Sequence, residues 1–235
     1  MTNTGDDRRH WSRVAQDWVA WARTPDHDAF WAYRQSLAVF VGRGGGLALD
    51  VGCGEGRVSR ELVALGYRVT ATDPVQAMVD AAADADSAHG YVVAEASRLP
   101  FADASFDLVV AYNMLMDVDD LPGAVREMRR VMWPAARLIA SVVHPFTDAV
   151  ADTDSYFDRR RFEGVEERDG LRMRFAGWSQ PLEAYSAALT DTGLAITALR
   201  EPVPDPVDER LERWTRMPLF LWLEARPSSV ARTRT

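Results

Sequence analysis

The stretch LDVGCGEGRVSREL, residues 49–62, restricts the possible folds of this chain more than any other segment. It places Gly52, Gly54 and Gly56 directly after an apolar run and directly before a segment with helical periodicity. A buried strand that turns within a few residues into a helix is the start of a parallel α/β unit. Glycines at that turn let a ligand approach the main chain without a Cβ in the way. The turn alone fits either a ligand site or close packing of the helix on the strand.

From residue 46 onward, short apolar segments alternate with segments of helical periodicity. Helices are expected at 57–65, 74–85 and around 121–132, between strands at 46–51, 67–72, 91–94, 107–112 and 137–143. This alternation predicts a doubly wound α/β sheet that is mostly parallel. A helix at 181–190, ended by Gly193, and two final strands at 194–199 and 219–225 complete the pattern.

Two regions lie outside this alternation. Near the start, apolar residues recur at helical spacing, namely Trp11, Val14, Trp18 and Trp21. This segment is either a helix fixed on the sheet or a lid that closes over a ligand. Residues 145–180 are charged and aromatic around Asp169-Gly170, which predicts a hairpin cap. We expect a helical lid over 1–45, a sheet domain over 46–226 with the cap inserted, and a flexible tail over 227–235.

The composition excludes several classes of partner. The 235 residues carry a formal net charge of −8, which argues against nucleic acid and anionic membranes. No apolar run reaches membrane-spanning length, and the first residues lack the apolar core of a secretory signal. The single cysteine, Cys53, indicates a reducing cytoplasm. The scattered histidines His10, His27 and His89 have no metal-ligand spacing, so no metal is expected.

Asp73, at the end of the second predicted strand, favours a ligand at the glycine turn. A carboxylate at that place can accept hydrogen bonds from both hydroxyls of a ribose, although it could also cap the next helix. The dinucleotide fingerprint needs a third glycine where this chain has Arg57, and no Gly-Lys-Ser/Thr follows for a P-loop. The two features together predict an adenosine-type ligand without a required pyrophosphate.

Four segments, in order, resemble the class I S-adenosylmethionine-dependent methyltransferases of the small-molecule type. LDVGCGEG resembles the first motif of that family, VTATDP the acidic second motif and AEASRLPFADASFDLVVA the third. AVREMRRVMWPAARLIASVVHP resembles the helix and strand that follow. The resemblance runs from about Leu47 to His144. WPAAR departs from the family's typical Pro-Gly-Gly turn, which puts the loop shape in doubt and not the binding site.

The resemblance implies a Rossmann-like sheet with an antiparallel last strand, and S-adenosylmethionine as cofactor. Gly52 and Gly54 would lie against its methionine part with Asp50 just behind, and Asp73 would bind the ribose. The other implied cofactor-binding residues are Glu95 and Ala96 at the adenine edge, Tyr112 and Asn113 at the amino group, and Cys53, Pro74, Met78 and Trp18. The acceptor would be the O, N or C atom of a small molecule, bound by a cytoplasmic monomer or homodimer.

His144, at the end of the fifth predicted strand, is the candidate general base. Strand ends face the ligand crevice, and histidine titrates near neutral pH. The alternative is that His144 hydrogen-bonds the loop or orients the substrate. Two other functions stay open. One is a non-catalytic scaffold or sensor that binds the cofactor; the other is an oxidoreductase with a nicotinamide cofactor, against which Arg57 argues.

Overall fold

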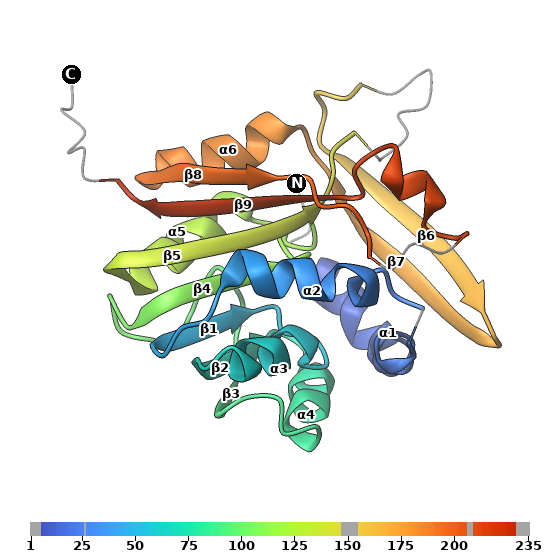
Figure 1. The fold of residues 1–235 in the computed structure, drawn as a ribbon, viewed down its shortest axis with the longest axis horizontal. Helices are drawn as coiled ribbons and strands as arrows, with labels where there is room; N and C mark the ends of the chain where they lie inside the picture. The colour runs from blue at the N-terminus through green and yellow to red at the C-terminus, as the bar shows by residue number, and fades with distance from the viewer. Residues whose placement is uncertain (1–5, 26, 147–154, 206–208, 229–235) are drawn as a thin grey trace.

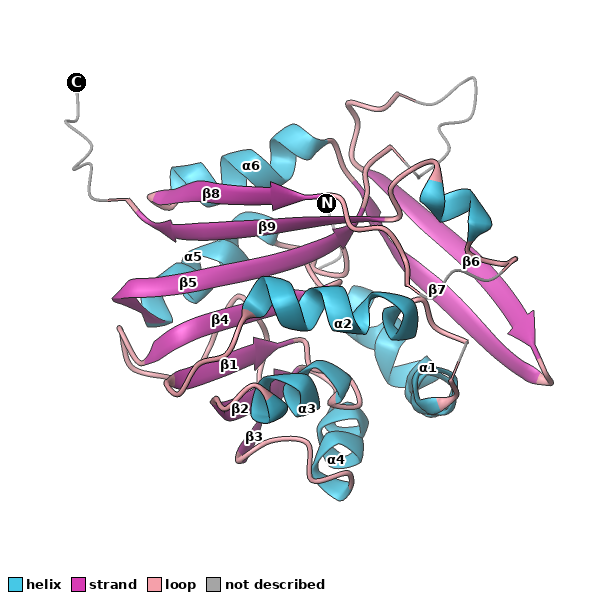
Figure 2. Ribbon diagram, viewed as in Figure 1, coloured by secondary structure: helices cyan, strands magenta, loops and turns pink. Residues whose placement is uncertain are grey.

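The structure is a computed structural model that describes residues 6–25, 27–146, 155–205 and 209–228. Its main element is a seven-stranded sheet with the order β3-β2-β1-β4-β5-β9-β8 (Figures 1 and 2). The strands are β1 (Leu47–Val51), β2 (Arg68–Asp73), β3 (Gly90–Val93), β4 (Phe106–Tyr112), β5 (Met132–Val143), β8 (Leu194–Arg200) and β9 (Phe220–Pro227).

The sheet is parallel from β3 to β5, and β9 then pairs antiparallel with both β5 and β8. The predicted fold class, a doubly wound sheet with an antiparallel last strand, is therefore confirmed. The first strand, β1, lies between β2 and β4, so the chain reverses its winding direction beside the glycine turn. Ligand crevices of open α/β sheets form at such a reversal.

Helices cover both faces of the sheet (Figure 1). On one face lie α2 (Phe30–Val41) and α3 (Arg57–Ala64), with α4 (Gln76–Asp84) near the β3 edge; on the other lie α5 (Leu121–Val131) and α6 (Leu182–Asp191). Each face has its own apolar core. Leu37, Leu62 and Trp222 belong to the first core, whereas Val125, Met128 and Leu189 belong to the second.

Two elements begin two or more residues away from the start that the sequence predicted. The helix expected from residue 74 begins at Gln76, because Asp73 Oδ1 accepts a hydrogen bond from the Val75 amide and keeps that residue extended. The strand expected from 137 begins at Met132, directly after α5, although its regular pairing with β4 resumes at Arg137. The segment WPAAR is therefore an irregular part of the β5 edge, far from the glycine turn.

The remaining elements lie at the carboxyl ends of the parallel strands. They are α1 (Asp6–Arg23), the short 3-10 helix η1 (Glu212–Thr215) and the antiparallel hairpin of β6 (Arg160–Arg168) and β7 (Leu171–Ser179), which turns at the predicted Asp169-Gly170 (Figure 1). The helix packs on the hairpin through Val14, Trp21 and Met173. Residues 147–154 of the expected cap and 229–235 of the expected tail lie outside the described residues.

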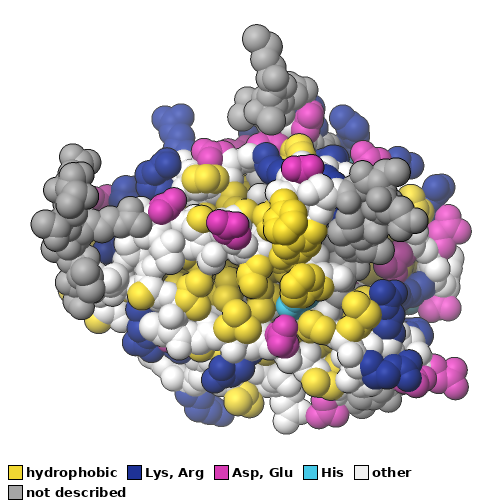
Figure 3. All heavy atoms as spheres, turned by 90° about the horizontal axis from the view of Figure 1, so that it is seen from above, with side chains coloured by type: hydrophobic (Ala, Val, Ile, Leu, Met, Phe, Trp, Pro, Cys, Tyr) yellow, Lys and Arg dark blue, Asp and Glu magenta, His cyan; other side chains and the backbone are white. Residues whose placement is uncertain are grey.

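The surface is mixed in character. Seen from above, apolar side chains gather in the middle of one face, with charged side chains spread around its edge (Figure 3). None of the helices in the described ranges is long and apolar enough to cross a membrane.

Candidate functional site

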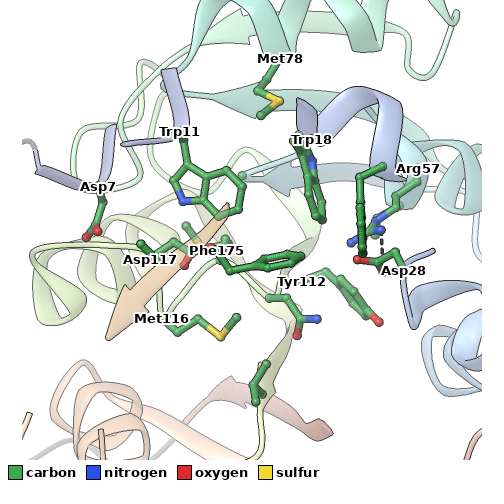
Figure 4. Close-up of a pocket in the computed structure, with 18 of the residues that line it drawn as sticks. Asp7, Trp11, Trp18, Asp28, Arg57, Met78, Tyr112, Met116, Asp117 and Phe175 are labelled. Atoms are coloured by element: carbon green, nitrogen blue, oxygen red, sulfur yellow. Dashed lines mark ion pairs between the residues drawn. The ribbon is translucent and has the colours of Figure 1, made fainter. Parts of the chain in front are cut away.

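A cavity of about 1140 Å³ opens between the carboxyl ends of the strands, α1 and the hairpin. We distinguish two ends of it. The glycine-turn end is formed by residues 52–55, Asp73, Met78 and Glu95. The hairpin end is formed by Asp7, Trp11, Met116, Asp117, Phe162 and Phe175, of which all but Phe162 are labelled in Figure 4. The cavity is large enough for two ligands side by side.

The glycine turn has a backbone that other residues adopt with difficulty. Gly52 and Gly54 have φ values of +70° and +55°. A Cβ at Gly52 would lie 2.7 Å from Met114 Cβ, and one at Gly54 would lie 3.0 Å from Trp18 Nε1. The glycines are therefore required both for the turn and for the approach of Met114 and Trp18 to it.

Asp73 is bound to this turn. Its Oδ2 accepts a hydrogen bond from the Gly54 amide (3.0 Å), and its Oδ1 accepts one from the Val75 amide (2.9 Å). Each oxygen can accept one further hydrogen bond, and the residue lines the cavity. Burial raises the pKa of Asp73 to about 6, against the opposing effect of the two amide hydrogen bonds. This arrangement can bind a pair of neighbouring hydroxyls.

Asp50 lies behind the turn and does not line the cavity. It accepts a hydrogen bond from the Ser59 hydroxyl at 2.6 Å, and burial raises its pKa to about 7. This hydrogen bond links β1 to α3 behind the turn. Cys53 is buried, with its thiol directed at the Gly54 carbonyl, and burial raises its pKa as well.

The other predicted cofactor-binding residues are brought to the same cavity. They are Gly52, Cys53, Gly54, Pro74, Met78, Glu95, Ala96, Tyr112, Asn113 and Trp18. Glu95 is half exposed and forms an ion pair with Arg8 of α1. Asn113 has a positive φ of 51°, with its amide bonded to Ser141 across the β4–β5 edge. The hydroxyl of Tyr112 is buried without a hydrogen-bond partner among the described residues.

Arg57 is a site residue that the sequence did not reveal. Its guanidinium lies 4.8 Å from the ring centres of both Trp18 and Phe30. Its Nη1 forms an ion pair with Asp28 Oδ1 (2.7 Å, Figure 4). This buried cation is therefore held beside the glycine turn by two aromatic rings and one carboxylate.

The predicted base, His144, is not among the residues that line the cavity. Its Nδ1 accepts a hydrogen bond from the Phe146 amide (3.2 Å), and its Nε2 lies 3.0 Å from Glu201. Both ring nitrogens are thus occupied at the end of β5. The hydrogen bond from the Phe146 amide gives His144 a role in holding this loop, and its role as general base stays a prediction.

The comparisons with known proteins agree with this geometry. Residues 49–140 match the family described as "Methyltransferase domain". The chain is 33% identical over 165 residues to malonyl-[acyl-carrier protein] O-methyltransferase of Enterobacter lignolyticus, covering 65% of this chain and 66% of the relative. It is 36% identical over 112 residues to demethylmenaquinone methyltransferase of Mycobacterium sp. (strain KMS), which covers 48% of this chain and 47% of that relative. The aligned parts span 24% to 66% of the curated relatives' lengths.

A solved structure shares the fold. The S-adenosylmethionine dependent methyltransferase from Mesorhizobium loti superposes with a TM-score of 0.67, covering 86% of this chain and 99% of its own, at 23% identity.

Proposed function

Because this chain belongs to the class I S-adenosylmethionine-dependent methyltransferases, we propose that it transfers a methyl group from S-adenosylmethionine to a small-molecule acceptor. The observation that carries the proposal is Asp73. Its carboxylate is fixed by the Gly54 amide at the turn and keeps one free acceptor position on each oxygen towards the cavity.

The residues at the glycine-turn end fit the chemical groups of this cofactor. Asp73 would accept hydrogen bonds from the two ribose hydroxyls, and the methionine part would lie beside Gly52 and Gly54, which line the cavity. Arg57 lines the cavity beside the turn and would attract the methionine carboxylate, with Asp28 sharing its charge. Glu95 and Ala96 line the same end and would meet the adenine edge.

The cofactor supplies a methyl group on a sulfonium; when a lone pair of the acceptor bonds to the methyl carbon, the carbon–sulfur pair stays on sulfur. The protein then has to align the acceptor and exclude water. The hairpin end of the cavity provides the space for the acceptor, enclosed by α1 and by β6 and β7.

We further propose that α1 closes the cavity as a lid. Its ends are attached to both halves of the site: Arg23 contacts Glu55 at the glycine turn (3.2 Å), and Asp7 accepts a hydrogen bond from Trp178 of the hairpin (2.8 Å). Hydrogen exchange around residues 18–23 should slow when S-adenosylhomocysteine binds, with most of the sheet already slow. Equal protection with and without the ligand would mean that α1 is a fixed part of the core.

Four measurements test the main proposal against its alternatives. Mass spectrometry of the purified protein should detect S-adenosylmethionine or S-adenosylhomocysteine, and calorimetry should show that the latter binds. Binding without methylation of any compound in a broad acceptor panel would favour a scaffold or sensor. Binding of NAD(P)H in preference to S-adenosylhomocysteine, measured by fluorescence, would instead indicate an oxidoreductase and contradict the proposal.

A further inference from the structure

The carboxyl group of Asp117 is unpaired at the hairpin end of the cavity. Other acidic residues that line the cavity have partners: Asp7 with Arg161 and Trp178, Asp28 with Arg57, Glu95 with Arg8, Glu166 with Arg168, and Asp120 with the Gly123 amide. Within the described ranges, the side chain of Asp117 forms neither a hydrogen bond nor an ion pair. Unpaired carboxyl groups inside a protein are costly, so this one calls for an explanation.

The loop that carries Asp117 is held firmly on both sides. The amide of Trp178 in β7 donates to the Met116 carbonyl (2.8 Å), and Arg159 Nη2 donates to the carbonyls of Val118 and Asp119 (3.0 Å each). These bonds fix the backbone on either side of Asp117. Its direction is therefore set by the loop and the hairpin, and its carboxylate is left available.

Beside Asp117 the hairpin has a glycine, Gly177, and therefore no side chain. A Cβ at Gly177 would lie 2.8 Å from Asp117 Oδ1 and 2.9 Å from the ring of Phe162. Glycine at this place lets the carboxylate lie against the β7 backbone. Any side chain there would displace either the carboxylate or the aromatic ring.

Aromatic rings line the same end of the cavity as this carboxylate. Trp11 and Phe175 lie on the same side of the cavity as Asp117 in Figure 4, and Trp18 contacts Phe175 edge to face (6.2 Å). Trp11 also contacts Trp18, and Trp11 Nε1 is buried without an acceptor among the described residues. An apolar ligand body would pack well against this wall.

The charged groups that act on Asp117 are two acidic residues and one arginine that already has a partner. They are Asp7 of α1, Asp73 at the end of β2 and Arg161 of β6, and Arg161 is already paired with Asp7. Burial and the two acidic neighbours raise the pKa of Asp117 well above its usual range. A positively charged ligand would supply the missing counter-ion.

We propose that the acceptor is an amine with an apolar body, whose ammonium group binds Asp117 while the body packs against Trp11 and Phe175. One carboxylate oxygen of Asp117 accepts a proton from the ammonium: an N–H bond breaks, an O–H bond forms, and the electron pair stays on nitrogen as the nucleophile. The proton later passes to solvent. This assignment rests on the proposed methyl transfer.

The same geometry disfavours an anionic acceptor. A carboxylate at the hairpin end would face Asp117 and be repelled. Of the five arginines that line the cavity, Arg8, Arg57 and Arg168 are each paired with an acidic residue, and Arg210 and Arg213 belong to the segment before β9. The cation that acts on Asp117 is Arg161, which is paired with Asp7, so an acceptor such as the malonyl group in the name of one relative has no matching charge at Asp117.

The test compares matched cations and anions. Phenethylamine and 3-phenylpropionate, and tryptamine and indole-3-propionate, differ mainly in the charge of the terminal group. Tryptophan fluorescence and calorimetry at pH 7.5, with and without S-adenosylhomocysteine, give their affinities. We expect each amine to bind at least about tenfold more tightly than its carboxylate partner, as a charge-assisted contact implies.

Variants of the loop separate a charge effect from a folding effect. Asp117→Asn should remove the preference for amines, Asp117→Glu should keep it, and Asp119→Asn on the same loop should leave it unchanged. All three should bind S-adenosylhomocysteine as the wild type does. If no amine binds better than its carboxylate partner, or if Asp117→Asn keeps the preference, the amine proposal is wrong. Absence of S-adenosylhomocysteine binding would instead remove the proposed function, whatever the amines do.

Discussion

The glycine-turn end of the cavity is assembled within residues 50–96, whereas the hairpin end joins segments that lie far apart in the chain. Asp7 and Trp178, which contact each other at the hairpin end, are 171 residues apart. At the glycine-turn end, the Gly54 amide and Asp73 are 19 residues apart, the first in the turn after β1 and the second at the end of the neighbouring strand β2. The first end follows from one strand–turn–helix–strand unit, which sequence patterns describe well; the second depends on tertiary packing.

This difference also separates the chemical roles of the two ends. The glycine-turn end uses backbone amides, positive φ values and one carboxylate, which suits a ligand of fixed shape. The hairpin end uses aromatic side chains and a carboxylate on a held loop, which can change between related proteins without altering the sheet. Variants confined to one end should therefore affect one ligand and spare the other.

The largest effect is expected for Gly54→Val. The new side chain would require a φ of +55° and would meet Trp18 Nε1, so calorimetry should detect no binding of S-adenosylhomocysteine. Gly45→Val is the matched control, because a Cβ there meets nothing within 4 Å, and it should bind normally. Thermal unfolding of both variants shows whether the sheet remains folded. Normal binding by a folded Gly54→Val protein would contradict the placement of the cofactor.

Asp73→Ala should weaken binding of S-adenosylhomocysteine by about 2–4 kcal/mol, since two charge-assisted hydrogen bonds to the ribose are lost. Asp73→Asn keeps one acceptor oxygen and should lose less. Asp80→Asn, an exposed change on α4, serves as the control for titration by calorimetry. Amine binding at the hairpin end should persist in all three proteins; its loss in Asp73→Ala would show that the two ends are not independent.

The affinity for S-adenosylhomocysteine should rise with pH. The folded pKa of Asp73 is raised to about 6 by burial, so the carboxyl group is mostly neutral at pH 5 and mostly ionised at pH 7. If only the ionised form binds both hydroxyls, affinity should increase about tenfold between these values. The same shift means that ionisation of Asp73 lowers folding stability as pH rises from about 4 to 6. Calorimetry on Asp73→Asn should give a nearly flat profile, and any remaining slope would point to Asp50.

The smallest effect is expected at Glu95. Glu95→Ala should weaken binding by about 1 kcal/mol and Glu95→Gln by less, because the amide oxygen can still accept from the adenine amine. Arg8→Gln breaks the Arg8–Glu95 ion pair without touching the acceptor oxygen, and separates the two contributions. Equal and negligible losses for both Glu95 variants would mean that the backbone alone holds the adenine.

The sequence predicted the sheet and the glycine-turn end because both depend on local patterns. In the structure, the residues that this spacing singled out contact each other, because the Gly54 and Val75 amides donate hydrogen bonds to the Asp73 carboxylate. Asp117 and Arg57 were not recognised, since an acidic residue in a loop or an arginine at a helix start has no local signature. Their roles appear only when the hairpin and α1 are placed beside them. His144 was chosen from its strand-end position, which does not determine the direction of a ring.

Because Asp7 is buried against the hairpin, the hairpin of this protein cannot be replaced by that of a relative without also replacing α1. Asp7 is 3% exposed, and its charge is met by Arg161 and Trp178, both from the hairpin. Exchange of the hairpin alone would leave a buried carboxylate without its partners, at a cost on the order of 3 kcal/mol. A chimera meant to carry a new acceptor preference therefore has to inherit residues 6–23 and 160–179 from the same parent. In this chain, acceptor choice therefore depends on two segments that are separate in the sequence and have to be exchanged together.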